Sequence, residues 1–191
     1  MYYSNKIQLL KKIFNDVEYK NDENFIILNN KKYLIVNDVI ILDNIDDKKD
    51  HLTNLKRNTV STFGDEWKEF SKITKEHYIE FDLYFSNYDY RQLKDKIFCD
   101  FGCGIGRWSR ILSDRVELGN LILCDYSDAI FVAREQFRHL DNVIFIKCDI
   151  DNLIFNKNLI DFFICLGVLH HLPKKFPSAI SKISHSCKSG I

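Results

Sequence analysis

One stretch decides the fold of this chain: Asp100-Phe101-Gly102-Cys103-Gly104-Ile105-Gly106-Arg107-Trp108. An apolar run precedes it and an amphipathic segment follows it, so a strand is expected to pass through a glycine turn into a helix. Glycines at every second position allow a sharp turn and a close approach to a ligand. The free N–H groups of the helix start favour a negatively charged group. The stretch therefore predicts a ligand site at the turn.

The spacing of the glycines argues against a dinucleotide site. The pattern G-x-G-x-x-G would place its third glycine at position 107, which is Arg107, whereas here the third glycine is Gly106. An NAD-dependent oxidoreductase would share the fold, but the glycine spacing of this loop does not match the pattern of such enzymes.

Beyond the loop, short apolar runs alternate with amphipathic stretches. The apolar runs are 97–100, 121–125, 143–148 and 160–166, and the amphipathic stretches are 107–114, 128–139 and 176–187. Alternation of strands and helices predicts an α/β fold with a doubly wound parallel sheet between two layers of helices. The second run ends in Asp125, which could accept hydrogen bonds from the two hydroxyls of a ribose, as it could in an NAD enzyme. The third run is followed by Asp149.

The order of these features resembles the class I S-adenosylmethionine-dependent methyltransferases of small molecules, which have a Rossmann-like fold. After the fourth run the chain reads Cys165-Leu166-Gly167-Val168-Leu169-His170-His171-Leu172-Pro173, similar to the segment that lines the donor and acceptor sites in that family. The resemblance implies S-adenosylmethionine as cofactor. It assigns the methionine end to Asp100, Gly102, Cys103, Gly104 and Gly106, the methionine ammonium to the Leu166 backbone, the ribose to Asp125, the flanks of the adenine to Tyr126 and Ile150, and the adenine amino group to Asp149.

Two histidines are candidates for acid or base catalysis. An unperturbed imidazole titrates near pH 6.5, and His170 and His171 lie in the segment that faces the acceptor in the family. We expect adjacent side chains to point apart, so that at most one of the two faces the site. The alternative is that both serve only loop packing or backbone hydrogen bonds.

The N-terminal part has a different pattern of apolar and polar residues. Residues 6–14 have helical spacing, and the β-rich runs 25–28, 33–36 and 39–42 are separated by Asn-rich turns, which predicts a three-stranded meander. The polar stretch 43–58 is the expected boundary between a small β appendage (1–50) and the methyltransferase core (60–191). The meander is faintly similar to the zinc ribbon that precedes some such enzymes, but it lacks the cysteines, and no metal site is predicted.

Two aromatic-rich helices are expected before the core, over 62–73 and 76–93. Their apolar residues, among them Phe81, Leu83 and Tyr84, are expected to be buried. The sequence Phe63-Gly64-Asp65-Glu66-Trp67 resembles a helix that helps to cover the donor in methyltransferases related to quinone-biosynthesis and arsenite enzymes.

The composition narrows the range of partners and locations. Lys plus Arg number 27 and Asp plus Glu number 27, so no net charge would attract nucleic acid or an anionic membrane. The chain has no apolar run near the roughly 20 residues that cross a bilayer, and residues 1–12 do not resemble a signal peptide, so a cytoplasmic location is expected. The six cysteines show no C-x-x-C spacing, and we expect them to be reduced.

The predicted function is methyl transfer to an unidentified small-molecule acceptor, with no catalytic nucleophile needed. The alternative is a non-catalytic, degenerate donor-binding module that serves as a partner of another subunit. The family core has seven strands, and residues 188–191 resemble the turn before the fifth, so we expect a C-terminally truncated sheet or a fragment. The acceptor atom and the oligomeric state stay open.

Overall fold

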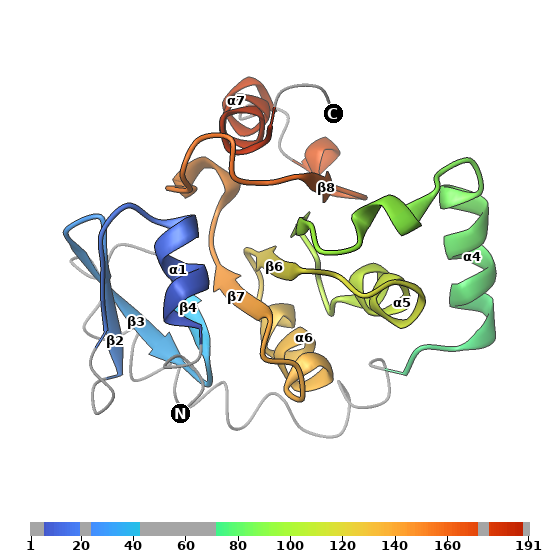
Figure 1. The fold of residues 1–191 in the computed structure, drawn as a ribbon, viewed down its shortest axis with the longest axis horizontal. Helices are drawn as coiled ribbons and strands as arrows, with labels where there is room; N and C mark the ends of the chain where they lie inside the picture. The colour runs from blue at the N-terminus through green and yellow to red at the C-terminus, as the bar shows by residue number, and fades with distance from the viewer. Residues whose placement is uncertain (1–5, 20–23, 43–71, 172–175, 189–191) are drawn as a thin grey trace.

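A computed structural model describes residues 6–19, 24–42, 72–171 and 176–188. Its strands form one sheet in the order β1-β2-β3-β4-β7-β6-β5-β8 (Figure 1). The strands are β1 (Val17–Tyr19), β2 (Phe25–Leu28), β3 (Lys31–Val36), β4 (Val39–Ile41), β5 (Ile97–Phe101), β6 (Asn120–Asp125), β7 (Val143–Lys147) and β8 (Phe162–Ile164). The helices are α1 (Ile7–Ile13), α4 (Lys75–Phe85), α5 (Arg107–Arg115), α6 (Ala129–Phe137) and α7 (Phe176–Ser186), with the 3-10 turns η2 (Tyr90–Leu93), η3 (Ile150–Asn152) and η4 (Leu169–His171).

The second half of the sheet is parallel, as predicted. β6 lies between β5 and β7, and β8 pairs with the other side of β5. The chain therefore reverses its direction of winding at β5, and the carboxyl ends of β5 and β8 flank the crevice where open α/β sheets bind ligands. The doubly wound, Rossmann-like fold is confirmed, although the strand expected over 160–166 is shorter than predicted.

Two apolar layers cover the two faces of the sheet. Alternate residues of each strand point to opposite faces, so Cys99 packs with α1 and α7, whereas Phe98 packs with α4, α5 and α6. Strand β7 is buried along its whole length, which suits a strand covered on both faces. The structure thus has the predicted three layers. No helix among the described residues has the length and apolar character needed to cross a membrane.

The N-terminal strands form the predicted meander and also extend the parallel sheet. Strands β2, β3 and β4 are antiparallel, and the structure adds the short strand β1, which the sequence did not predict. Strand β4 then pairs in parallel with β7, with Ile40 opposite Ile146. The predicted boundary segment 43–58 and the Phe63 to Trp67 motif lie outside the described residues. The division into units 1–50 and 60–191 stays a prediction.

Both hairpin turns of the meander consist of residues with positive φ. Asn29 and Asn30 have φ of 50° and 63°, and Asn37 and Asp38 have φ of 46° and 61°. Asn and Asp tolerate this left-handed conformation, and two such residues in a row give the turn that matches the twist of paired strands. The Asn-rich dipeptides therefore correctly predicted the hairpins.

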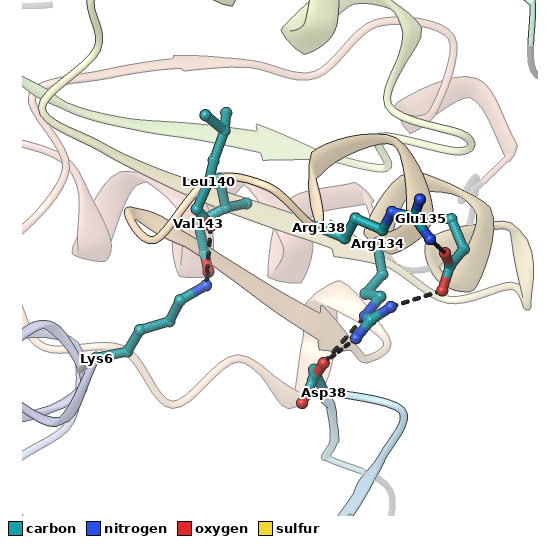
Figure 2. Close-up of polar contacts among 7 residues, drawn as sticks. All are labelled: Lys6, Asp38, Arg134, Glu135, Arg138, Leu140 and Val143. Atoms are coloured by element: carbon teal, nitrogen blue, oxygen red, sulfur yellow. Dashed lines mark hydrogen bonds and ion pairs between the residues drawn. The ribbon is translucent and has the colours of Figure 1, made fainter. Parts of the chain in front are cut away.

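Polar contacts also tie the N-terminal part to the rest of the sheet (Figure 2). The Lys6 side chain is 1% exposed, and its Nζ donates to the carbonyl oxygens of Val143 and Leu140. Burial lowers the pKa of Lys6 to about 7. At the tip of the β3–β4 hairpin, Asp38 accepts from Nε of Arg134 in α6 at 3.0 Å. The start of α1 and the hairpin tip are thus both anchored on the α6–β7 unit.

Two expectations about the aromatic-rich region are wrong. The helix expected over 76–93 ends at Phe85, and a separate turn, η2, begins after Asp89, which accepts from the backbone N–H of Arg91 at 3.2 Å. Of the apolar stripe on α4, Phe81 is buried, but Leu83 is 75% exposed and Tyr84 is also exposed. Only one side of this single helix packs on the sheet. The helix expected over 62–73 lies almost entirely outside the described residues.

Candidate functional site

The predicted site residues lie at one edge of the sheet. Asp100 is the fourth residue of β5, Asp125 ends β6, Asp149 follows β7, and Leu166 follows β8. These strands are parallel, so their carboxyl ends meet at the same edge. The structure therefore brings these four positions, which span 67 positions of sequence from 100 to 166, to the same edge of the sheet.

The glycine loop has the geometry that its sequence predicts. Gly102, Gly104 and Gly106 all have positive φ, at 76°, 55° and 79°. A Cβ on Gly102 would lie 2.1 Å from Cγ2 of Val168, and a Cβ on Gly106 would lie 3.0 Å from Cε2 of Phe137. A Cβ on Gly104, in contrast, would meet no atom within 4 Å. Packing thus requires two of the glycines, whereas Gly104 leaves open space for a ligand.

Asp125 links the glycine loop to the end of β6. One carboxylate oxygen accepts from the backbone N–H of Gly104 at 2.7 Å. The other accepts from the backbone N–H of Ser127 at 2.7 Å and from its hydroxyl at 2.6 Å. These bonds hold the carboxylate in one orientation beside the open space at Gly104. A carboxylate oxygen can accept more than one hydrogen bond, so hydroxyl groups of a ligand can still bind there.

Asp100 is a buried acid next to the same loop. It is 2% exposed, and Ser109 in α5 donates a hydrogen bond to it at 2.6 Å. Burial raises the pKa of Asp100 to about 7, the Ser109 bond opposes this, and the charge of Asp125 adds to it. Ser109 was not among the residues predicted for the site. Its signal was a small polar residue on the buried face of the helix that follows the loop.

The residues assigned to the adenine differ in their surroundings. Asp149 begins the turn η3, where its side chain accepts from the backbone N–H of Asp151 at 3.1 Å. Tyr126 is 69% exposed, so its ring is open to a partner, whereas the Ile150 side chain is packed in the apolar core. Roles for these residues in binding a donor stay predictions.

The segment after β8 begins at the same edge of the sheet, because β8 pairs in parallel with β5. Leu166 and Gly167 are exposed, and Gly167 has a φ of 72°. The rings of His170 and His171 are exposed and lie against each other, with centroids 3.9 Å apart. The expectation that these side chains point apart is therefore wrong. It holds for an extended chain, but here the backbone folds into the turn η4.

The cysteines are all free, as expected for reduced thiols, and five of the six are buried. Burial raises the pKa of Cys99 and of Cys165 to about 11, so these thiols stay protonated and unreactive near neutral pH. In the part of the chain that the structure describes, no cluster of three or more His, Cys, Asp or Glu side chains is arranged to hold a metal ion.

A hollow of about 610 Å³ lies elsewhere, between α4 and η2. It is lined by Asp82 and by residues 85–91, all of which precede β5 in the chain. None of these residues lies at the carboxyl end of a parallel strand. The hollow is therefore lined by none of the predicted site residues.

Comparison with known proteins finds a similarity to methyltransferases. A family model described as a methyltransferase domain matches residues 98–190. The fold is similar to that of a Methanococcus maripaludis protein described as an S-adenosyl-L-methionine-dependent methyltransferase, with 17% identity and a TM-score of 0.52, over 64% of this chain and 58% of that one. It is also similar to a SAM-dependent methyltransferase from Aquifex aeolicus, with 17% identity and a TM-score of 0.53, over 63% of this chain and 65% of that one.

This chain spans less than two thirds of the length of either of those proteins. A search of the curated proteins finds no match. The segment matched by the family model contains the glycine loop, the acids that follow it and strands β6, β7 and β8. Over this segment, 93 of the chain's 191 residues, the protein is similar to the methyltransferase domain family.

Proposed function

We propose that the protein is an enzyme that binds S-adenosylmethionine at the carboxyl ends of β5 to β8 and transfers its methyl group to a small-molecule acceptor. The observation that carries the proposal is the open space at Gly104, next to the oriented carboxylate of Asp125. A backbone without a side chain beside a fixed anion suits a ligand that presents hydroxyl groups and must approach closely.

The chain's own residues fit the parts of this donor. Asp125 would accept from the ribose hydroxyls, and Asp149 would accept from the adenine amino group, with the exposed ring of Tyr126 on one flank. The loop from Gly102 to Gly106, with Asp100 beneath it, would receive the methionine end. The Leu166 backbone would accept from the methionine ammonium. A positive ammonium near Asp100 would favour the ionised form of this buried acid.

In methyl transfer the protein itself needs to form no covalent bond with the reactants. The bound donor supplies a methyl carbon that is activated by a positive sulfur, so the chain has to bind, align and desolvate the two reactants. The exposed pair His170 and His171 borders the crevice and is our candidate for accepting a proton from the acceptor. The balance of acidic and basic residues favours a small acceptor over nucleic acid. The expected cytoplasmic location belongs to this proposal and rests on sequence alone.

Calorimetric titration tests the donor site, with S-adenosylmethionine, S-adenosylhomocysteine and NAD as ligands. We expect both sulfur ligands to bind and NAD not to bind; binding of NAD alone would overturn the proposal. A second assay follows transfer of a labelled methyl group from the donor to a panel of small acceptors. Binding of the donor without transfer to any acceptor would instead support the non-catalytic module.

A further inference from the structure

The segment 150–156, which follows the proposed adenine acid Asp149, is held by the N-terminal part of the chain. Strand β7 ends at Lys147, and the backbone then runs through η3 toward α1 and the β2–β3 hairpin. We infer that α1 and this hairpin position the Asp149 loop for the adenine of the donor, with Asn29 as the positioning residue. The inference rests on the proposed function.

Hydrogen bonds to the far end of this segment come from residues more than 120 positions away in sequence. The backbone N–H of Asn156 donates to the carbonyl oxygen of Ile13 at 2.8 Å. The side-chain amide of Asn156 donates to the carbonyl oxygen of Lys12 at 3.0 Å. The amide nitrogen of Asn29 donates to the carbonyl oxygen of Ile154 at 3.3 Å. The C-terminal end of α1 and the hairpin tip therefore grip residues 154–156.

Asn29 joins three pieces of chain at one point. Its side-chain oxygen accepts from the backbone N–H groups of Asn15 and Asp16, at 3.0 Å and 3.4 Å. This fixes the orientation of the amide, because the oxygen must face the two N–H groups and the nitrogen then faces Ile154. Its φ of 50° belongs to the hairpin turn itself. Asn29 thus connects the hairpin, the end of α1 and the segment after Asp149.

Aromatic packing extends the same connection to the glycine loop. The Phe155 ring is buried and contacts Phe14, with centroids 5.8 Å apart in an edge-on arrangement. On its other side Phe155 lies 6.5 Å from Phe101, the residue before Gly102. A shift of residues 154–156 would therefore affect both the Asp149 loop and the glycine loop of the proposed donor site.

The near end of the segment has its own local bonds, which do not involve the N-terminal part. Asn152 donates from its backbone to the carbonyl oxygen of Asp149 at 2.8 Å, and Lys182 of α7 donates to Leu153 at 3.5 Å. Loss of the Asn29 contact should therefore leave the loop folded but less well placed. Recognition of the adenine amino group depends on a carboxylate held within hydrogen-bond distance, so a small displacement weakens binding.

The test compares Asn29→Asp with Asn30→Asp. Aspartate at position 29 keeps an oxygen for Asn15 and Asp16 but turns a second oxygen, instead of an N–H donor, toward the Ile154 carbonyl. Asn30→Asp is the matched control, because Asn30 has the same left-handed conformation, is exposed and undergoes the same change of charge. Calorimetry then gives the affinity for S-adenosylhomocysteine and for adenosine, and hydrogen exchange reports on the amides of residues 150–156.

We expect Asn29→Asp to weaken both ligands about five- to tenfold, as for the loss of one hydrogen bond, and to speed exchange over residues 150–156. Asn30→Asp should match the wild type. Equal affinities for the two variants would overturn the inference, and so would a loss for S-adenosylhomocysteine without a loss for adenosine. If Asn29→Asp does not fold, Asn156→Ala, which removes the bond to Lys12, is measured instead and should give the same result.

The failure of the proposed function would look different. If the wild-type protein binds neither S-adenosylhomocysteine nor adenosine, the proposed donor site is wrong. The proposed role of Asn29 in donor binding is then wrong as well. Unchanged exchange of residues 150–156 in Asn29→Asp would overturn the positioning role even if the wild type binds the donor.

Discussion

The two halves of the sheet place their polar groups in different ways. In β5 to β8 the strands are parallel, and acids and glycines lie at or just after the strand ends, so they converge on one edge of the sheet. In β1 to β4 the strands are antiparallel, their ends alternate between the two edges, and their polar groups are used in turns and anchors such as Asn29 and Asp38. The parallel half can therefore build a binding site, while the antiparallel half covers the edge of β7 and fixes the segments beside it.

The largest expected effect comes from the glycine loop of the parallel half. Gly102→Ala places a Cβ against Val168 in a left-handed backbone, and we expect it to lower the free energy of unfolding by about 3 kcal/mol. Gly104→Ala meets only the backbone strain and should cost about 1 kcal/mol. Urea denaturation measures both.

The double variant Gly102→Ala with Val168→Ala removes the two colliding methyl groups and should recover part of the loss. Equal costs for Gly102→Ala and Gly104→Ala would show that the contact with Val168 does not determine this position.

Asp125 provides the second test of the parallel half. We expect Asp125→Ala to weaken S-adenosylhomocysteine binding by about 2 to 3 kcal/mol, because it removes charge-assisted hydrogen bonds to the ribose. Ser127→Ala is the control, since it removes one bond to the carboxylate but leaves the anion and the Gly104 contact in place. Calorimetry at one pH compares the three proteins. Unchanged affinity of Asp125→Ala would rule out the ribose assignment.

Lys6 tests how the antiparallel half is attached. Burial lowers the pKa of Lys6 from 10.5 to about 7, and Asp141, Asp38 and Arg134 are the charged groups around it. Between these two pKa values the unfolded chain binds more protons than the folded chain, so stability should rise with pH, by at most about 1.4 kcal/mol per unit.

Chemical denaturation between pH 7 and 8.5 measures this rise. Lys6→Met should remove it, whereas Lys11→Met, which changes an exposed lysine of the same helix, should retain it. A rise that persists in Lys6→Met would mean that another group causes it.

The smallest effect expected is the pH dependence of donor binding. The pKa of Asp100 is about 7 in the free protein, and a ligand ammonium would lower it, so affinity for S-adenosylhomocysteine should increase with pH up to about 7 and then level off. The increase is at most about tenfold per unit.

Calorimetry between pH 5.5 and 8 checks this increase. Asp100→Asn should bind more weakly but with a flatter profile, while the double variant His170→Gln, His171→Gln should keep the wild-type profile. A profile that flattens only in the histidine variant would assign the titration to the turn η4 instead of to Asp100.

Much of the parallel half could be predicted, because the sequence signals for its strands, turn and helices lie within a few residues of one another. The strand from 97, the glycine turn and the helix from Arg107 follow one another within a few residues, and hydrophobic periodicity marks each of them. The acids lie directly at strand ends, so their convergence follows from parallel topology alone. The end of α4 at Phe85 was missed, because Tyr88 and Tyr90 suggested a longer aromatic stripe, although the polar residues Ser86 and Asn87 come before them.

Pairings between distant segments could not be predicted. Nothing local indicates that Ile40 pairs beside Ile146, that Ser109 bonds Asp100, or that Asn29 reaches Ile154. Each of these contacts depends on how whole layers of the structure are arranged. Judged from the sequence, several other polar side chains could have made the same contacts.

By itself, the sequence determined the class of fold and the glycine turn, because spacing along the chain sets which residues follow which strand. Only the tertiary structure decided that the meander joins the sheet through β4 and that α1 and Asn29 grip the segment after Asp149. The physical reason is that hydrophobic periodicity determines which face of each helix or strand is buried, but not which distant element covers that face.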